Sequence, residues 1–257
     1  MLNQLFNLSG RAALITGGSK GIGKAIARAL AEAGAHVAIT ARHEDELVRA
    51  KQEIGAGLDV RVETLVANMY ERSEVDRLAA WALKTFGRVD ILFNNAGSNR
   101  PQPLVETTDD SWDEIFELNV TSCMRLARAL APQMIERRWG RIIHLSSVMA
   151  LASNPGRGCY SATKAALIGM ARAHALELGP YGVTVNCIAP GPVATDLPMS
   201  VLNDEQKHKF AELTAVKRWG HVRDMVGPAL LLASDAGAFM TGTVVVADGG
   251  MLCRTFY

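Results

Sequence analysis

The chain has 257 residues, with 27 Lys and Arg against 26 Asp and Glu, and 49% of its residues are hydrophobic. This near-neutral charge excludes a nucleic-acid or anionic-membrane surface as the main function, since such surfaces carry a clear excess of Lys and Arg. The composition is that of a globular protein with a sizeable core. Because α/β folds of ~250 residues commonly form one domain, we expect a single domain over residues 1–257.

Nothing in the chain predicts membrane insertion or secretion. No apolar run reaches the ~20 residues of a transmembrane helix, and the first residues lack the basic and apolar regions of a secretory signal. The four cysteines are isolated, without a CxxC pair or a Cys/His cluster at metal spacing. We therefore expect a cytoplasmic protein with reduced cysteines and no bound metal, in which Cys159 is a small hydrophobe rather than a nucleophile.

Short runs rich in Ile and Val alternate with segments of helical period, which is the pattern of repeated βαβ units and a parallel sheet. The expected strands, in chain order, are 11–16, 36–40, 60–66, 89–93, 141–145, 183–188 and 243–246. The expected helices between them are 21–33, 44–54, 73–86, 111–137 (mostly helical) and 159–178. No linker, low-complexity tract or internal repeat interrupts this pattern, so it predicts no second domain.

The least regular stretch is 190–213, between the sixth strand and the last helices. A loop of that length in a compact fold is usually functional. We expect it to be a lid with the substrate beneath it.

A glycine-rich turn, TGGSKGIG at residues 16–23, follows the first expected strand and opens the first helix. Glycines let the backbone approach a pyrophosphate, and the helix N-terminus offers free N–H groups and the positive end of its dipole. A glycine string alone is weak evidence, but its place between strand and helix in a βαβ unit favours nucleotide binding.

The residues after the second strand bear on which dinucleotide binds. NAD sites commonly hold the ribose with a carboxylate about 20 residues after the glycines, whereas an arginine accepts the 2′-phosphate of NADP. The second strand ends at Arg42 without an acid, and Glu44 and Asp45 fall in a first helical turn, where acids suit the dipole. Lys20 and Arg42 would converge on the phosphate, so NADP(H) is favoured over NAD(H). The alternative is that both are solvated surface charges.

Tyr160 and Lys164 stand at i and i+4 on the helix expected over 159–178, so they share one face. A phenol titrates near ~10 and is a poor acid or base at neutral pH, but a neighbouring ammonium stabilises the phenolate. Such a pair can shuttle a proton, although a YxxxK pair alone is more often a surface pair. Ser147 ends the fifth strand and NNAG, residues 94–97, follows the fourth, which puts them at the sheet edge where α/β folds bind ligands.

Together these motifs mean that the chain resembles the short-chain dehydrogenase/reductase family over nearly its whole length. The family's glycine, NNAG, PG and closing motifs correspond to residues 17–23, 94–97, 190–195 and 247–250. The resemblance implies a Rossmann fold, with a doubly wound seven-stranded parallel sheet and helices on both faces, and a homotetramer. The implied catalytic residues are Asn119, Ser147, Tyr160 and Lys164. The implied cofactor contacts are Gly17, Ser19, Lys20, Gly21, Ile22, Gly23, Arg42, Asn68, Asn95, Ala96, Gly97, Tyr160, Lys164, Pro190, Gly191, Val193 and Thr195.

The resemblance also implies a division of roles. Tyr160 would give or take the substrate proton, and Ser147 would hydrogen-bond the substrate oxygen. Lys164 would hold the nicotinamide ribose, and Asn119 would position a water in a proton relay. One departure is Asn68, where the family commonly has Asp; an amide can still contact the adenine amino group.

Two groups within the family are most similar to this chain, and they predict different substrates. Gluconate 5-dehydrogenases act on sugar acids, whereas 3-oxoacyl-carrier-protein reductases dock an acidic carrier on two arginines. One of these corresponds to Arg138, but the other corresponds to Tyr181, which cannot pair with an acid. Arg100, Asn154 and Arg157 lie on loops near the expected carbonyl position, where an arginine could clamp a carboxylate. Both arginines could equally point to water or to a subunit contact.

The sequence therefore favours an NAD(P)-dependent oxidoreductase acting on the ketone or secondary alcohol of a small polar metabolite. The alternative within the family is a 3-oxoacyl-carrier-protein reductase. A non-catalytic NADP-binding sensor or scaffold would share the fold. Such a protein has no chemical need for Ser147, Tyr160 and Lys164 together, which argues against that possibility.

Overall fold

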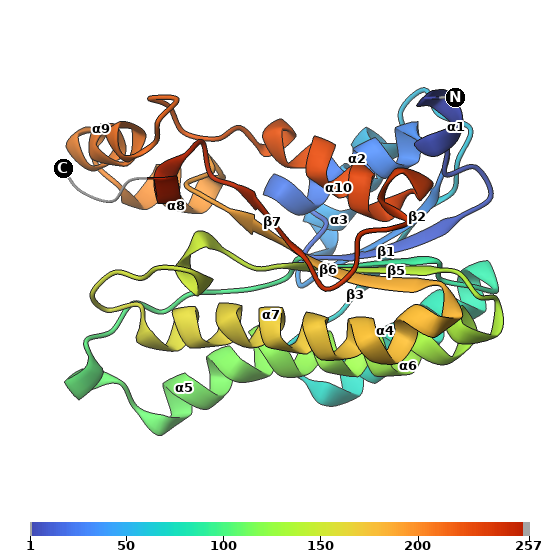
Figure 1. Ribbon diagram of the computed structural model, residues 1–257, viewed down its shortest axis with the longest axis horizontal. Coiled ribbons are helices and arrows are strands. Elements are labelled where there is room, and N and C mark those ends of the chain that lie inside the picture. The colour runs from blue at the N-terminus through green and yellow to red at the C-terminus, as the bar shows by residue number, and fades with distance from the viewer. Residues whose placement is uncertain (1, 254–257) are drawn as a thin grey trace.

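Seven parallel strands form one sheet in the order β3-β2-β1-β4-β5-β6-β7 (Figure 1). The computed structural model describes residues 2–253. The strands are β1 Ala12–Thr16, β2 His36–Ala41, β3 Val62–Val66, β4 Ile91–Asn94, β5 Gly140–Leu145, β6 Val183–Pro190 and β7 Val244–Ala247. The strand order reverses between β1 and β4, which is where doubly wound sheets bind their ligands. The predicted fold class is confirmed.

Helices cover both faces of the sheet, with α2, α3 and α10 above it and α4, α6 and α7 below it in Figure 1. The α-helices are α1 Leu2–Leu5, α2 Gly21–Glu32, α3 Glu44–Gly55, α4 Arg72–Phe86, α5 Asp109–Phe116, α6 Ser122–Glu136, α7 Gly158–Leu178, α8 Asp196–Val201, α9 Asp204–Leu213 and α10 Val226–Ala233. The short turns are η1 Leu104–Glu106, η2 Glu117–Thr121, η3 Val148–Ala150, η4 Gly179–Tyr181, η5 Val222–Met225, η6 Asp235–Gly237 and η7 Met251–Cys253.

Most residues of the central strands are apolar, because helices cover both of their faces. Every residue of β1 and of β6 is buried. The two faces of the sheet build two separate cores, one against α4, α6 and α7 and the other against α2, α3 and α10. Because all seven strands are parallel, their carboxyl ends lie together at one edge of the sheet.

The prediction of an irregular loop at 190–213 was wrong, because this stretch contains the two helices α8 and α9. The start of α9 carries a capping box: the side chain of Asn203 accepts from the N–H of Gln206 at 2.9 Å, and the side chain of Gln206 accepts from the N–H of Asn203 at 3.0 Å. This pattern was readable in the sequence, but the weak apolar period of the helix concealed it. Elsewhere the expected limits differ from the observed ones by a residue or two.

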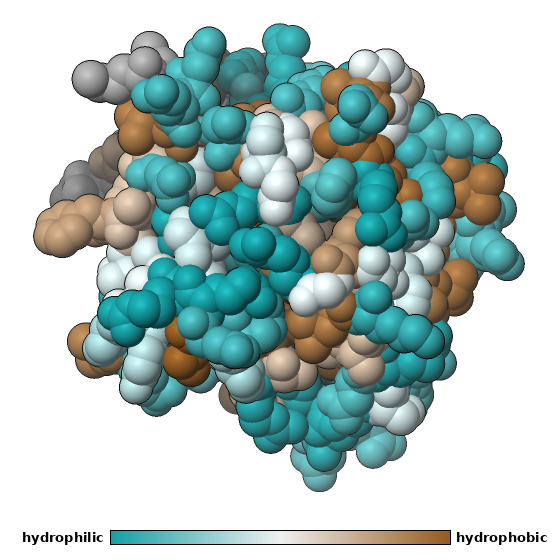
Figure 2. Space-filling view, turned by 90° about the vertical axis from the view of Figure 1, so that its right-hand side faces the viewer, coloured by the Kyte–Doolittle hydropathy of each residue, from teal (hydrophilic) through white to brown (hydrophobic). Residues whose placement is uncertain are grey.

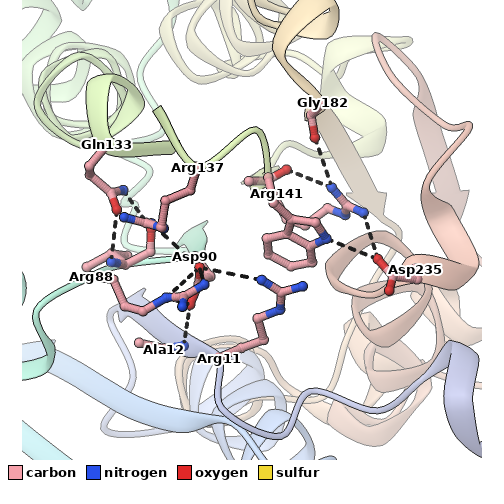
Figure 3. Close-up of polar contacts among 12 residues, drawn as sticks. Arg11, Ala12, Arg88, Asp90, Gln133, Arg137, Arg141, Gly182 and Asp235 are labelled. Atoms are coloured by element: carbon pink, nitrogen blue, oxygen red, sulfur yellow. Dashed lines mark hydrogen bonds and ion pairs between the residues drawn. The ribbon is translucent and has the colours of Figure 1, made fainter. Parts of the chain in front are cut away.

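The amino-terminal edge of the sheet is held by a buried carboxylate. The side chain of Asp90 is 0% exposed and accepts from both Arg88, at 2.8 and 2.9 Å from Nε, and the N–H of Ala12 at 2.9 Å (Figure 3). Arg137 and Arg11 add more distant charges, at 3.5 and 3.9 Å from Asp90 Oδ1. Asp90 is therefore the acceptor that joins the start of β1 to the segments before β4 and β5.

Beside this carboxylate, the indole of Trp139 lies between two guanidinium groups, 3.7 Å from Arg11 and 4.2 Å from Arg141. Arg141 and the Trp139 Nε1 group both bond to Asp235, at 3.2 and 3.1 Å (Figure 3). Burial lowers the pKa of Arg141 to about 10, so it remains charged at neutral pH. The network ties η6 to the same edge of the sheet.

The right-hand end of the molecule in Figure 1 is seen face-on in Figure 2, where hydrophilic residues predominate and apolar ones form separate patches. Among residues 2–253, no helix is both long and apolar enough to span a membrane.

Candidate active site

Four loops meet at the carboxyl edge of the sheet, the left-hand end in Figure 1. They follow β1, β4, β5 and β6, and the N-terminal part of α7 packs beside them against η3. Apart from Asn119, the residues that the sequence predicted to be catalytic or cofactor-binding lie on these loops, at or just after the ends of β2, β3 and β6, or at the starts of the helices that follow.

The glycine-rich turn after β1 forms a cradle in which side chains do not fit. Gly17 and Gly21 have φ of 63° and 57°, in the left-handed region that favours glycine. A Cβ on Gly23 would lie 2.3 Å from the carbonyl oxygen of Gly17 and 2.5 Å from Asn95 Nδ2. Since no side chain caps the start of α2, its N–H groups are open to an anion. The turn fits a dinucleotide pyrophosphate.

The NNAG loop after β4 is tied to this cradle by its second asparagine. Asn95 Nδ2 donates to the carbonyl oxygens of Thr16 and Gly17, at 2.8 and 2.9 Å. The hydroxyl of Thr16 in turn accepts from the N–H groups of Asn95 and Ala96, at 3.1 and 3.0 Å. These four bonds join β4 to β1 at the point where the strand order reverses.

Lys164 is the buried cation at the centre of the site. Its side chain donates to the carbonyl oxygen of Leu145 at 2.7 Å, and Nζ lies 5.6 Å from the centroid of the Tyr160 ring. A Cβ on Gly97 would lie only 3.3 Å from Nζ, so a side chain at this position would crowd the ammonium. Tyr160 is half-buried. The i, i+4 pair predicted from the sequence therefore lies at the sheet edge.

Ser147 is buried just after β5, and its Oγ accepts from the N–H of Met149 at 3.1 Å. The hydroxyl proton is not used by any hydrogen bond within residues 2–253. The neighbouring Ser146 donates to the carbonyl oxygen of Lys164 at 2.8 Å, which joins this loop to α7. Ser147 can therefore still donate to a substrate oxygen.

Asn119 lies in a π-helical turn, η2, between α5 and α6. Its Nδ2 donates to the Ser98 carbonyl oxygen at 2.9 Å and to Thr163 Oγ1 at 3.0 Å, while its Oδ1 accepts from the Ser98 N–H at 2.9 Å. The amide is thus fully engaged in holding the loop after β4 against α7. Its main-chain oxygen accepts from the Cys123 thiol at 3.3 Å.

The polar side chains of the glycine-rich turn have a partner that the sequence analysis missed. Ser19 Oγ and Lys20 Nζ donate to the two oxygens of Glu46, at 3.0 and 3.1 Å. Partial burial opposes the charge of Glu46, but the bonds from Lys20 and Ser19 outweigh it and lower the pKa of this carboxyl. Arg42, by contrast, is exposed and has no polar partner in the described part of the chain.

A cavity of about 600 Å³ lies beside Arg42 and Asn68. Asn68 is fixed there because its N–H donates to Glu74 at 2.7 Å and its Oδ1 accepts from the Tyr70 N–H at 3.3 Å. The other lining residues are Tyr70, Glu71, Asp113, Glu114 and Glu117. Arg42 and Asn68 are on the side expected for the adenosine end of a dinucleotide.

The segment after β6 reaches back to the cofactor cradle. A Cβ on Gly21 would lie 3.4 Å from Thr195 Cγ2, and one on Gly191 would lie 2.7 Å from Asp248 Cα. Val193 pairs with Gly220 in an isolated parallel bridge. Of the predicted contact residues at 190–195, Thr195 therefore lies directly beside the glycine-rich turn.

The side chains predicted to bind substrate have different surroundings. Arg100 Nη2 forms an ion pair with Glu114 at 2.7 Å. Asn154 is exposed, and within residues 2–253 its side chain makes one weak polar contact, to Met149 Sδ at 3.9 Å. Arg157 is half-buried at the start of α7 and has no polar side-chain partner within residues 2–253. Arg157 is thus the cation of this set that remains available.

A fully buried histidine beneath the site was also missed. His144 on β5 lies opposite Asn94, and its Nδ1 is 3.1 Å from Asn94 Nδ2. Burial, helped by His174 and Lys164, lowers the pKa of His144 to about 3, so it is neutral at physiological pH. Burial also raises the pKa of the Cys123 and Cys187 thiols to about 11 and 12, and that of Cys159 in the same direction.

Known proteins share both the sequence and the fold. The family described as Enoyl-(Acyl carrier protein) reductase matches residues 17–252. The 3-oxoacyl-[acyl-carrier-protein] reductase FabG of Haemophilus influenzae is 37% identical over 244 residues, covering 95% of this chain and 99% of that protein. A 3-oxoacyl (acyl-carrier-protein) reductase from Agrobacterium tumefaciens with NADP bound has a TM-score of 0.92 at 32% identity, covering 97% of each chain.

A second solved structure has a different description. It is a Beutenbergia cavernae protein provisionally described as an NAD(P) dependent gluconate 5-dehydrogenase, with NADP bound at low occupancy. Its TM-score is 0.92 at 35% identity, and the match covers 97% of this chain and 100% of that one.

The site combines a glycine cradle at the edge of a parallel sheet with a buried lysine and a phenol. This combination is typical of a dinucleotide-dependent oxidoreductase. The chain belongs to the short-chain dehydrogenase/reductase family, as its motifs predicted. It is an NAD(P)-dependent oxidoreductase of that family, and its relatives include proteins named for two different substrates.

Proposed function

We propose that this protein transfers a hydride between NADP(H) and the ketone or secondary alcohol of a small polar metabolite of the sugar-acid or polyol type. The observation that carries the proposal is the position of Lys164, which is anchored on Leu145 at 2.7 Å and lies 5.6 Å from the Tyr160 ring. A buried ammonium beside an accessible phenol serves acid–base chemistry, whereas a scaffold has no need for it.

The residues of this chain would divide the work. In reduction, the Tyr160 phenol gives its proton to the substrate oxygen, and in oxidation the phenolate takes that proton back. The free hydroxyl proton of Ser147 donates a hydrogen bond to the same oxygen, and the Lys164 ammonium stabilises the phenolate. When bound, the nicotinamide supplies or accepts the hydride.

The cofactor would be held along the carboxyl edge of the sheet. The glycine-rich turn would take the pyrophosphate, Lys20 and Arg42 the 2′-phosphate, Asn68 the adenine, and Lys164 the nicotinamide ribose. The engaged amide of Asn119 suits the holding of Ser98 and Thr163 in place, at 2.9 and 3.0 Å. We infer that Asn119, held in this way, positions a water in a proton relay.

We expect NADP(H) to bind more tightly than NAD(H), and the difference to shrink about tenfold in Arg42→Ala. A charge-assisted phosphate contact is worth about 1.5 to 3 kcal/mol, and the exposure of Arg42 favours the lower value. Fluorescence titration with NADPH and NADH measures both dissociation constants. Arg49→Ala, which removes an exposed arginine paired with Asp45 on α3, is the control. Equal dissociation constants in the unmodified protein would contradict this prediction.

We expect Arg157→Ala to raise KM for a carboxylate substrate roughly tenfold, while KM for a neutral diketone changes little. The loss of one charged contact costs about 1.5 kcal/mol when it is equally strong in the ground and transition states. Arg100→Ala should have a smaller effect, because Glu114 already neutralises Arg100 at 2.7 Å. Steady-state kinetics with paired acid and neutral substrates measures this. A parallel rise in KM for both substrates would reject the carboxylate clamp.

The second candidate function is 3-oxoacyl-carrier-protein reduction, which the name of the 37% identical Haemophilus influenzae relative favours. Against it stands Tyr181, 41% exposed where carrier-docking reductases have an arginine. The test is a panel of sugar acids, polyols, diketones and acetoacetyl-carrier protein, followed by the absorbance of NADPH. If the carrier substrate gives a higher kcat/KM than every sugar acid, the second function replaces the first.

We also propose a homotetramer, which the family resemblance implies. The apolar side chains of Leu176 and Phe239 are 81% and 104% exposed, and association would cover such surfaces. Sedimentation velocity measures the assembly.

A further inference from the structure

Glu46 engages both polar side chains of the glycine-rich turn at once. Its Oε2 accepts from Ser19 Oγ at 3.0 Å and its Oε1 from Lys20 Nζ at 3.1 Å. The Glu46 side chain is 24% exposed, whereas that of Lys20 is 61% exposed, so solvent shields the carboxylate less than it shields the ammonium. The carboxylate therefore competes for the groups with which this turn would meet a phosphate.

Resting on the proposed NADP(H) function, we propose that Glu46 weakens the preference of this protein for NADP(H) over NAD(H) by occupying Lys20 and Ser19. A 2′-phosphate that approaches Lys20 meets an ammonium already neutralised by a carboxylate, and the two anions repel each other. Arg42 has no such competitor among the described residues. NAD(H) carries no 2′-phosphate, so Glu46 does not repel it in this way. Glu46 therefore reduces the difference in affinity between NADP(H) and NAD(H) that Lys20 and Arg42 create.

The substitution that isolates this charge is Glu46→Gln, which keeps the size of the side chain and one of the two acceptor oxygens that meet Ser19 and Lys20. Because one like-charge contact near a protein surface is worth about a factor of ten, we expect the dissociation constant of NADPH to fall about tenfold. That of NADH should stay within about twofold. Titration of cofactor fluorescence measures both without any substrate.

A second ion pair between α2 and α3 provides a matched control. Lys24 on α2 and Glu53 on α3 form an ion pair at 2.7 Å, away from the glycine-rich turn. Glu53→Gln removes the same charge from α3, so a general change in net charge would alter NADPH binding there too. We expect both dissociation constants to be unchanged in Glu53→Gln.

Adding Lys20→Ala to Glu46→Gln should abolish the gain in NADPH affinity, because the freed ammonium is what the gain requires. Unchanged or weaker NADPH binding in Glu46→Gln would overturn the inference and make Glu46 an orienting partner for Lys20. Weaker NADH binding alone would also overturn it and assign Glu46 to a ribose hydroxyl. An unmodified protein that binds neither cofactor would instead refute the proposed function itself.

Discussion

Tyr160→Phe should lower turnover by at least about 100-fold, the usual contribution of a positioned general acid or base. The substitution keeps the ring that faces Lys164 Nζ at 5.6 Å and removes only the hydroxyl. Cofactor affinity should change little, because the remaining cofactor contacts are intact. The loss should appear equally in kcat and kcat/KM, since the proton moves only in the transition state.

Single-turnover kinetics with the best substrate of the panel, together with a cofactor titration, checks this result. Tyr181→Phe is the control, since Tyr181 is a partly exposed tyrosine on η4 before β6, at the opposite edge of the sheet. Near-normal turnover in Tyr160→Phe would reject the proton-shuttle role and with it the proposed mechanism.

Asp90→Asn should lower the free energy of unfolding by about 3 kcal/mol. Removing one partner from a buried charge pair typically costs about 3 to 5 kcal/mol, and the partly exposed arginines here favour the lower value. Asparagine keeps the volume and can still accept from the Ala12 N–H, so the variant isolates the charge. Arg11, Arg88 and Arg137 would then repel each other without the negative charge between them (Figure 3).

Urea denaturation followed by circular dichroism measures this loss. Asp76→Asn is the matched control: Asp76 pairs with Arg125, but its side chain is 54% exposed. Exposed pairs contribute about 0 to 1 kcal/mol. If Asp90→Asn costs no more than Asp76→Asn, the buried carboxylate does not hold the amino-terminal edge together.

The fold was predictable because buried strands and helices have a residue composition that is visible in the local sequence. Predominantly apolar runs such as β6, separated by segments of helical period, specify parallel strands covered on both faces. The i, i+4 spacing of Tyr160 and Lys164 depends only on helix geometry, so their shared face needed no tertiary information. The glycines at 17 and 21 could be assigned for a similar reason, since their φ values are local.

The pairings of charged residues could not be predicted, because they join elements that are distant in sequence. The partner of Lys20 is on α3, and the partner of Arg100 is on α5. The bond between His144 and Asn94 depends on the register of β4 against β5, and strand patterns do not fix it. The sequence analysis therefore assigned Lys20 and Arg100 to ligands. In the structure, Glu46 and Glu114 neutralise these two charges.

The π-helical turn at Glu117–Thr121 also sets the rotational phase between α5 and α6. The Ser122 N–H donates to the Glu117 carbonyl oxygen, so this turn holds one residue more than an α-helical turn. Because each residue advances a helix by about 100°, the extra residue rotates α5 relative to α6. Deleting one residue there would restore a continuous α-helix and swing Glu114 through that angle, away from Arg100. A one-codon deletion would thus break the ion pair between Arg100 and Glu114 while the sheet stays unchanged.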